Sequence, residues 1–512
     1  MRGVQAKLVA FGALVAVALA GAGASSAVAA SPRLAPHLAG AEPQATIKVA
    51  QFNCDISDEY PQIPATLVAR AIRASGADVV GVEEGGGEIP QIAQALGWHY
   101  YDVRMQIVSR LPLIDPPNGN GLFTYVEVSP GRVAALENVH LPSNRYGPNM
   151  IRRGATAAEV LAVERKVRVP AVKPDLVEAK KLMAQGIPVF LTGDFNSPSF
   201  HDWTKATVGL RPELKFPLRW PASLAVEKAG FTDSFRAVYP DPVTVPGLTW
   251  PTHRTYKHTD HFANAPKDRI DFVFSHGATP IASNIIGEPG APGITKSISP
   301  WPSDHRLVVS TFTLDGATPP TLVTVPQRLV ATGTPVPVSF HADGAAKGTI
   351  VIERLDPGPA AVVATRHVQG TDLQGLGTET FASGLWAPGA YEVLLRSDSQ
   401  TPSTFPFWVE APGTPPAIYT SSRTFAVGDP VVVNVRNAPG ERWDWLGIYK
   451  RGANPNVAPY LMWGYTSSAI DGQISLGPYA HGTWPLPAGK YTVYLLRDDM
   501  YGTMARADFR IR

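Results

Sequence analysis

Cysteine is nearly absent from the 512-residue sequence, which contains only Cys54. An intramolecular disulfide is therefore excluded, and stability must come from the burial of apolar side chains. Cys54 lies inside an apolar strand pattern. The pattern favours a buried, unreactive thiol over a nucleophile, because a reactive thiol needs an accessible, electropositive setting.

The sequence also lacks an excess of either positive or negative charge. Its formal net charge is only +2, and charged residues make up 17% of the chain. No large basic field therefore indicates nucleic-acid binding. After residue 30, no stretch reaches the ~18 uninterrupted apolar residues that a membrane-spanning helix needs. Proline and glycine are plentiful, with 49 and 46 residues. This composition is typical of a β-rich protein with many turns, and the length allows two to four domains.

The first 30 residues have the pattern of a secretory signal peptide. Arg2 and Lys7 give a positive start, an apolar segment follows, and small residues lead to Ala29 and Ala30. We therefore expect cleavage near Ala29 or Ala30, no transmembrane segment, and a secreted, extracellular protein with a loose leader at 31–46.

The stretch Ile187–Pro198, IPVFLTGDFNSP, brings two polar side chains to the end of a core strand. Its apolar start predicts a strand buried on both faces, and Ser197-Pro198 predicts a turn. Asp194 and Asn196, two residues apart, should point the same way. Burying a carboxylate there costs free energy unless it is paired or binds a metal, and an unpaired one is a candidate for a role in a reaction. The alternative is an Asx-type turn, in which both side chains only bond the local backbone.

Further predicted strands also carry polar residues, at their ends or, for Asp271, within the strand. The strands are expected at 46–54, 78–82, 121–128, 133–139, 268–275 and 307–314, with helices at 63–75 and within 156–185. The polar residues are Asn53, Asp55, Glu83, Glu84, His140, Asp271, Asp304 and His305. Strands with interspersed helices and hairpins favour two packed mixed sheets with helices outside over a doubly wound parallel sheet.

This set of side chains is rich in oxygen ligands. The sequence has no second cysteine and no HExxH spacing, which disfavours zinc sites of those kinds. Carboxylates and carboxamides suit Mg²⁺, Mn²⁺ or Ca²⁺. A hard cation with a histidine and an extra acid is suited to hydrolysis of phosphate esters. Asp271 is the candidate to hold His305 in a productive orientation.

Six segments, FNCD, VEE, NVHLP, LTGDFN, RIDFVF and SDHR, occur in this order within residues 45–315. In sequence and order they resemble the endonuclease/exonuclease/phosphatase superfamily. The resemblance implies an α+β fold for 45–315, a DNase I-like four-layer α/β/β/α sandwich. It also implies a metal-dependent phosphoesterase in which water attacks phosphorus directly, without a covalent enzyme intermediate.

The resemblance further implies residue roles. Glu84, most directly, and Asn53 and Asp304 would bind the metal, with Mg²⁺ expected and Mn²⁺ or Ca²⁺ as alternatives. Asp194 and Asn196 would position the attacking water and the phosphate. His305 would contact the scissile phosphate with Asp271 as its partner, and His140 would lie over the phosphate. Glu83 stands where members often have Gln, so Glu84 is the expected ligand, whereas the role of Asp55 stays open.

Substrate contacts are harder to predict. Arg145, Arg152 and Arg153 could grip phosphates, and the alternative is a solvated basic loop. Trp250 could stack on a base or a sugar ring, and the alternative is simple burial. A second metal site at His258, Asp260 and His261 is disfavoured, because no further ligand is evident.

The tail after the proline linker at 317–320 contains an internal repeat. Gly389–Leu395 matches Gly489–Leu495, and Gly333–Val338 matches Gly428–Val433. Each copy has alternating strand patterns, which predict two β-sandwich modules at 321–411 and 416–512. The RWDWLGIY stretch at 442–449 resembles immunoglobulin-like modules appended to some phosphatases. For the modules we expect spacing, contact with a cell surface or polymer, or substrate capture.

The sequence thus predicts a secreted metal-dependent phosphoesterase, with a phosphodiesterase acting on nucleic acid as first choice. The alternative substrate is a small or lipid-linked, inositol-type phosphate monoester. A third hypothesis is a catalytically silent secreted binding protein, against which the intact set of polar residues argues. The near-neutral charge argues against tight duplex binding, which needs Lys and Arg at phosphates.

Overall fold

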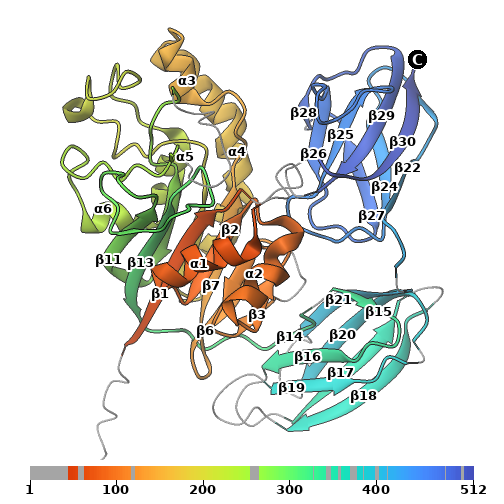
Figure 1. Ribbon diagram of the computed structural model, residues 1–512. Helices are drawn as coiled ribbons and strands as arrows, with labels where there is room; N and C mark the ends of the chain where they lie inside the picture. The colour runs from red at the N-terminus through yellow and green to blue at the C-terminus, as the bar shows by residue number, and fades with distance from the viewer. Residues whose placement is uncertain are drawn as a thin grey trace, which may run out of the picture. The chain divides into compact units, whose positions relative to one another are not determined.

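Two mixed sheets form the centre of the region from β1 to β13, residues 45–314 (Figure 1). The computed structural model describes 44–55, 63–116, 121–253, 264–326, 328–341, 347–355, 359–369, 377–384, 386–397, 403–411, 413–478, 480–497 and 501–512. The predicted signal peptide at 1–30 lies outside these residues. Residues 44–512 belong to one unit by their contacts.

The first sheet has seven strands and the second has six. In spatial order the first contains β12 (Lys296–Ser297), β11 (Ala278–Gly287), β13 (Leu307–Leu314), β1 (Ala45–Asn53), β2 (Val79–Glu83), β4 (Ile107–Ser109) and β3 (Tyr100–Asp102). The second contains β5 (Leu113–Ile114), β6 (Thr124–Ser129), β7 (Arg132–His140), β8 (Val189–Asp194), β10 (Asp271–His276) and β9 (Thr232–Asp233).

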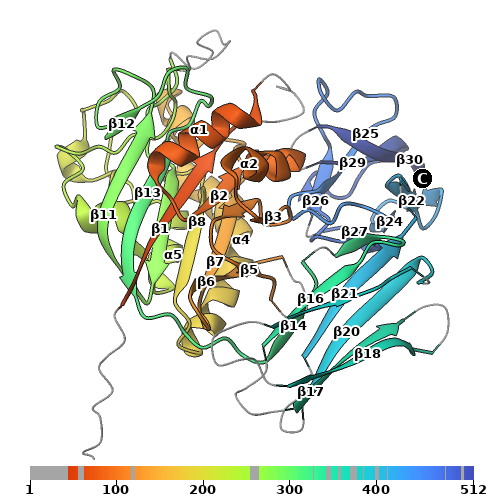
Figure 2. The same ribbon diagram turned by 60° about the horizontal axis from the view of Figure 1, so that its bottom comes forward.

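Helices cover the outer faces of both sheets (Figure 2). They are α1 (Ala65–Ser75), α2 (Ile89–Leu96), α3 (Gly147–Arg152), α4 (Ala157–Ala184), α5 (Pro221–Lys228) and α6 (Ser234–Val238), with short 3-10 turns at Gly86–Glu88 and Lys205–Thr207. Because side chains alternate along a strand, Val49 of β1 packs against Leu136 of β7 between the sheets, whereas Phe52 faces α1 and α2. Leu191 of β8 packs against α4 and α5. The predicted four-layer α/β/β/α sandwich is confirmed.

Element bounds differ from the sequence prediction in instructive places. The helix expected from residue 63 begins at Ala65, because Pro64 is its N-cap. The segment 156–185 is one helix despite two internal prolines, and a Thr156–Glu159 capping box starts it. The strand expected from residue 268 begins at Asp271 instead, because the Asp268 backbone pairs with that of Trp250 in an isolated bridge.

The two sheets approach each other closely at Gly81 of β2. A Cβ atom there would collide with the side chains of Thr192 and Asn138, which are fully buried and hydrogen-bonded to each other at 2.8 Å. We expect Gly81→Ala to lower the free energy of unfolding by about 1–3 kcal/mol, the cost of overpacking a filled core. The midpoint of urea unfolding measures this change.

Gly384→Ala is the matched control, because a Cβ atom at Gly384 meets nothing within 4 Å. Its unfolding midpoint should stay within the range of an ordinary surface substitution, about 0.5 kcal/mol. Equal midpoints for the two variants would contradict a tight contact between the sheets at Gly81.

The C-terminal region contains two pairs of sheets. The first pair is β14 (Leu322–Thr324), β16 (Val336–His341) and β19 (Gly377–Phe381) against β15 (Leu329–Ala331), β21 (Ser403–Glu410), β20 (Gly389–Ser397), β17 (Lys347–Arg354) and β18 (Ala361–Gln369). The second pair is β22 (Ala417–Thr420), β24 (Val431–Arg436) and β27 (Gly472–Leu476) against β23 (Thr424–Phe425), β30 (Thr503–Ile511), β29 (Gly489–Leu496), β25 (Trp445–Lys450), β26 (Met462–Tyr465) and β28 (His481–Gly482).

The matched segments of the repeat occupy matched places in the two pairs of sheets. Tyr391 and Tyr491 each donate a hydrogen bond of 2.7 Å to the carbonyl four residues earlier, and both rings are buried in their cores. We call these pairs of sheets the first and second modules, while their predicted boundaries remain a prediction. Among the described residues, no helix combines the length and apolar character needed to cross a membrane.

Candidate active site

Strand pairing gathers the predicted site residues at one edge of the two central sheets. Asn53 pairs with Glu83 at the parallel ends of β1 and β2. Asp194, at the end of β8, is in register with His140 of β7 and with Asp271 at the start of β10. Sequence reasoning placed all of these at strand ends except Asp271, which it placed inside the strand expected at 268–275, and the register explains why they meet.

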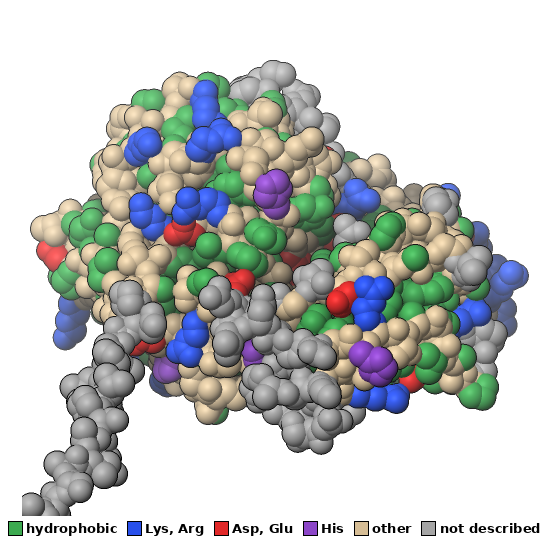
Figure 3. Space-filling model, turned by 90° about the horizontal axis from the view of Figure 1, so that it is seen from below, with side chains coloured by type: hydrophobic (Ala, Val, Ile, Leu, Met, Phe, Trp, Pro, Cys, Tyr) green, Lys and Arg blue, Asp and Glu red, His purple; other side chains and the backbone are tan. Residues whose placement is uncertain are grey.

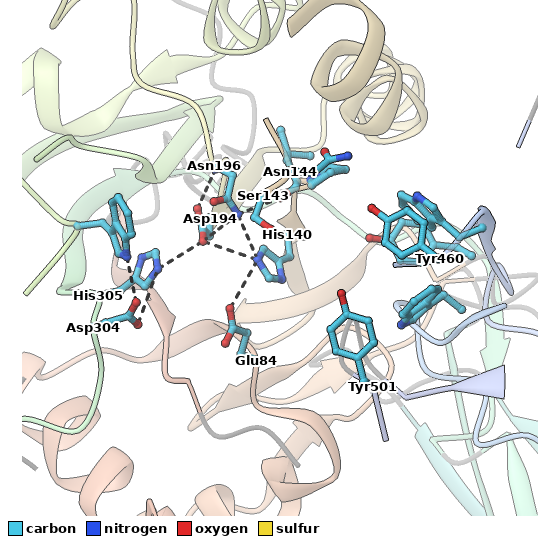
Figure 4. Close-up of a pocket in the computed structure, with 16 residues that line it drawn as sticks. Glu84, His140, Ser143, Asn144, Asp194, Asn196, Asp304, His305, Tyr460 and Tyr501 are labelled. Atoms are coloured by element: carbon cyan, nitrogen blue, oxygen red, sulfur yellow. Dashed lines mark hydrogen bonds and ion pairs between the residues drawn. The ribbon is translucent and has the colours of Figure 1, made fainter. Parts of the chain in front are cut away.

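Asp194 is the centre of the arrangement (Figure 4). Its Oδ2 atom accepts a 3.2 Å hydrogen bond from Asn53 Nδ2 and lies 3.7 Å from Nε2 of both His140 and His305. Its Oδ1 atom accepts the backbone N–H of Asn196 at 2.8 Å. The local Asx-type bond and the contacts with the other strands therefore coexist. Burial raises the pKa of Asp194 to about 6, and Asp271 adds to the rise, although the two histidines oppose it.

His305 is fixed by Asp271. Its Nδ1 atom lies 3.1 and 3.0 Å from the two Asp271 carboxylate oxygens, so Nε2 is left facing Asp194. Ser303 Oγ accepts the His305 backbone N–H at 2.9 Å. Burial lowers the pKa of His305, but Asp271, Asp304 and Asp194 together raise it well above its usual value. The predicted pairing of His305 with Asp271 is present.

Glu83 and Glu84, adjacent in sequence, occupy different environments. Glu83 is fully buried beneath the site, where Gln51 donates 2.5 Å and 2.8 Å bonds to Glu83 and Asp271. Burial raises the pKa of Glu83 well above normal, and Asp271 and Asp194 raise it further. Glu84 instead lines the pocket and accepts a 3.0 Å bond from Asn53 Nδ2. This placement agrees with choosing Glu84 as the ligand.

Asp304 is held by the residue predicted to stack on substrate. Trp250 Nε1 donates a 2.9 Å hydrogen bond to Asp304 Oδ2, and the half-buried Trp250 ring also lines the pocket. His140 completes this side, with Nε2 3.8 Å from Glu84 Oε1 and its ring edge-on to Trp443. Asp55 is buried nearby, where its backbone N–H bonds Asn53 Oδ1 at 3.2 Å.

The basic residues predicted to contact substrate are placed differently. The described lining of the pocket does not include Arg145 or Arg152. Arg145 is exposed, and the Arg152 guanidinium bonds the buried Glu213 at 3.1 and 2.8 Å. Arg152 thus has a structural partner, and its substrate contact stays a prediction. His258, Asp260 and His261 lie outside the described residues.

The donor set fits a hard divalent cation. Glu84, Asp194 and Asp304 supply carboxylates, Asn53 supplies a carboxamide, and the described lining of the pocket contains no Lys or Arg to neutralise them. Asp194, Asp271 and His305 also have ligand atoms within 4.8 Å of one another. Because the Asp271 oxygens already bond His305 and Gln51, the carboxylates facing the pocket are the better ligands.

The second module supplies residues that sequence reasoning did not place at the site. The pocket has a volume of about 410 Å³, and Trp445, Tyr460, Trp463, Tyr465 and Tyr501 line it together with the polar groups. The density of aromatic residues between 443 and 465 is a signal in the sequence, but it does not say what those residues face.

Comparison with known proteins identifies the family of this chain. Residues 50–305 match the model of the Endonuclease/Exonuclease/phosphatase family. An uncharacterized protein of Caenorhabditis elegans is 32% identical over 187 residues, which are 34% of this chain and 59% of that protein. The chain therefore spans about three fifths of the length of this curated relative.

Two solved structures are similar to this chain. One is an endonuclease/exonuclease/phosphatase from Beutenbergia cavernae, at 18% identity and a TM-score of 0.32, covering 71% of this chain and 100% of that chain. The other is a family protein from Bacteroides thetaiotaomicron, at 15% identity and a TM-score of 0.31, covering 54% of this chain and 97% of that chain.

Proposed function

We propose that this chain, which belongs to the endonuclease/exonuclease/phosphatase family, hydrolyses compact organic phosphate esters with the aid of a divalent cation. The pocket is the observation that carries this proposal. Its described lining combines the polar groups around Asp194 with five aromatic side chains and contains no Lys or Arg.

A polymer substrate would need additional cationic contacts along its phosphates. On the face shown in Figure 3, Lys and Arg side chains lie in small groups among hydrophobic and other side chains. A cavity of about 410 Å³ is in the range of small-molecule sites. The volume of the cavity and its described lining without Lys or Arg favour the small-ester alternative, while nucleic acid as substrate stays a prediction that the assay below tests.

Glu84, Asn53 and Asp304 would hold the cation, which when bound would offset phosphoryl charge. Asn196 and Asp194 orient the attacking water, and Asp194 accepts its proton. His305, oriented by Asp271, donates to a phosphoryl oxygen, and His140 lies across the site from it. The bond between phosphorus and the ester oxygen then breaks, and the organic group leaves as an alkoxide that takes a proton from solvent water and becomes an alcohol.

The pattern of residues 1–30 supports the further proposal that the protein is exported. Expression of the full sequence in a secreting bacterium, followed by N-terminal sequencing of the product in the medium, tests it. A product that stays in the cell with residues 1–30 attached would contradict export.

Chelation tests the dependence on a cation. The full chain is treated with EDTA, dialysed, and assayed with Mg²⁺, Mn²⁺, Ca²⁺ or no metal against p-nitrophenyl phosphate, bis-p-nitrophenyl phosphate, plasmid DNA and RNA. We expect chelation to lower hydrolysis at least a hundredfold and a divalent cation to restore it. Thermal unfolding is a second readout, because a cation that binds only the folded state raises the unfolding temperature.

The outcomes separate the hypotheses. Hydrolysis that persists after chelation would contradict the cation, and cleavage of plasmid DNA or RNA in preference to both small esters would favour a nuclease. A cation that raises the unfolding temperature without hydrolysis of any of the four substrates would contradict the enzyme and favour a binding protein.

A further inference from the structure

The second module presents an aromatic surface to the catalytic groups (Figure 4). We call Trp445, Tyr460, Trp463, Tyr465 and Tyr501 the aromatic wall. β25 and β26 carry three of these residues, and Tyr460 and Tyr501 come from the loop before β26 and the segment before β30. Tyr460 and Tyr501 both meet the Trp445 ring edge-on, at 6.0 and 5.7 Å between centroids.

The wall is not part of the core of the module. Alternation along β25 sends Leu446 and Ile448 into the core between the two sheets, and it sends Trp445 and Tyr449 to the opposite face. An outer sheet face is ordinarily polar when it meets water. This face forms a separate apolar cluster instead, with the half-buried tyrosines of the wall packed against it.

The equivalent sheet face of the first module lacks these aromatic residues. Strand register makes Ile352 of β17 equivalent to Ile448 of β25, since they pair with the equivalent residues Val393 and Val493. By the same register, Thr349 stands in the first module where the second module has Trp445. Glu353 likewise stands where the second module has Tyr449. The core positions are therefore alike in the two copies, and the aromatic face is particular to the second.

Specific contacts hold the wall at the pocket. The Arg442 backbone N–H bonds the Arg104 carbonyl at 3.0 Å, and its guanidinium bonds the Asn138 carbonyl at 2.5 Å and pairs with the buried Asp175. Asn144 of the first domain and Tyr460 of the module both line the pocket. Arg442 thus ties the module to the strand that ends at His140.

We infer that the aromatic wall is a subsite for a flat ring in the organic group of the substrate, with the phosphate at Asp194 and His305. This inference rests on the proposed function, which places the phosphate. Aromatic side chains bind flat rings by stacking, which does not need charge. The absence of Lys and Arg from the described lining fits a ring that carries no further phosphate groups.

A matched pair of ligands tests the subsite. Adenosine 5′-monophosphate and ribose 5-phosphate present the same phosphate on the same primary carbon, and only the first has a flat ring. Each is titrated by calorimetry into the full chain with Mg²⁺ and used as a competitor of p-nitrophenyl ester hydrolysis. We expect the nucleotide to bind at least tenfold more tightly, and Tyr460→Ala and Tyr501→Ala each to lower that preference at least threefold.

Three controls keep the test sharp. Tyr460→Phe should keep the preference, because the ring remains, and Tyr419→Ala removes an exposed tyrosine of the other sheet and should also keep it. Ribose 5-phosphate affinity should be the same in all variants. Because calorimetry needs no turnover, a chain that hydrolyses nothing but prefers the nucleotide would contradict the proposed function and support the subsite.

Two results would overturn the inference. Equal affinity of the wild-type chain for the two ligands would show that the wall does not bind a flat ring. Choline phosphate that binds more tightly than the nucleotide, and loses affinity in Tyr460→Ala, would identify the wall as a cation site instead, since aromatic faces also attract quaternary ammonium groups.

Discussion

His305→Ala should lower kcat/KM for phosphate esters about a thousandfold, because it removes a fixed donor from the site of bond breaking. The imidazole Nδ1 is held by both Asp271 oxygens, and Nε2 faces Asp194 at 3.7 Å. Steady-state kinetics on the chromogenic ester that the wild type hydrolyses best measures the loss. His99→Ala, which removes an exposed histidine, should leave kcat/KM unchanged.

The variant Asp271→Asn separates two contributions to activity: the orientation of His305 by Asp271, and the donation of a hydrogen bond by His305 to the phosphate. The change keeps the shape of the side chain but removes the charge that holds His305, so kcat should fall while KM changes little. Unfolding curves of each variant show that activity is measured on folded protein, since Asp271 is fully buried and also accepts a bond from Gln51. A His305→Ala enzyme within tenfold of the wild type would contradict the role assigned to His305.

The central sandwich and its site were largely predictable because the signals are local. Apolar runs such as residues 188–191 mark buried strands. An acid at the end of such a strand costs free energy unless it is paired, binds a metal or takes part in a reaction. Each of the strands β1, β2, β7 and β8 could be recognised within about ten residues. The register that brings His140 opposite Asp194 follows once the strands pair in one sheet.

The contribution of the second module could not be predicted, because it depends on contacts between residues far apart in the chain. The aromatic residues after Arg442 are consistent with an ordinary sandwich core, and alternation alone does not reveal that one face meets a catalytic site. The partner of Arg152 could not be predicted for the same reason. Nothing local in the sequence shows that Glu213, 61 residues later, accepts its guanidinium.

Arg442 also provides positive charge next to two buried acids of the first domain. Glu137 and Asp175 are buried acids of the first domain, and neither Glu137 oxygen has a hydrogen-bond partner among the described residues. Burial raises the pKa of both acids, and Asp175 raises the pKa of Glu137 further. Arg442 is a cation that lowers the pKa of both. Two acids of the catalytic domain are therefore compensated by the second module.

Arg442→Met should consequently lower the free energy of unfolding by about 3–5 kcal/mol, because it leaves buried acids without their cation. Denaturant unfolding measures the loss. Arg451→Met is the matched control, since Arg451 pairs with Asp508 at 2.8 Å on the surface of the same module, with both side chains about half exposed. Removing such an exposed pair should cost less than about 1 kcal/mol.

The double variant Arg442→Met, Asp175→Leu decides whether the pair docks the module or only neutralises charge. Replacing both partners by apolar groups removes the buried charge, so most of the lost stability should return. The backbone and carbonyl contacts of Arg442 show that it also sets position, since its guanidinium bonds Asn138, two residues before His140. We therefore expect the double variant to stay folded yet to lose the preference for adenosine 5′-monophosphate over ribose 5-phosphate. A double variant that keeps the full preference would show that Arg442 contributes stability without positioning the aromatic wall.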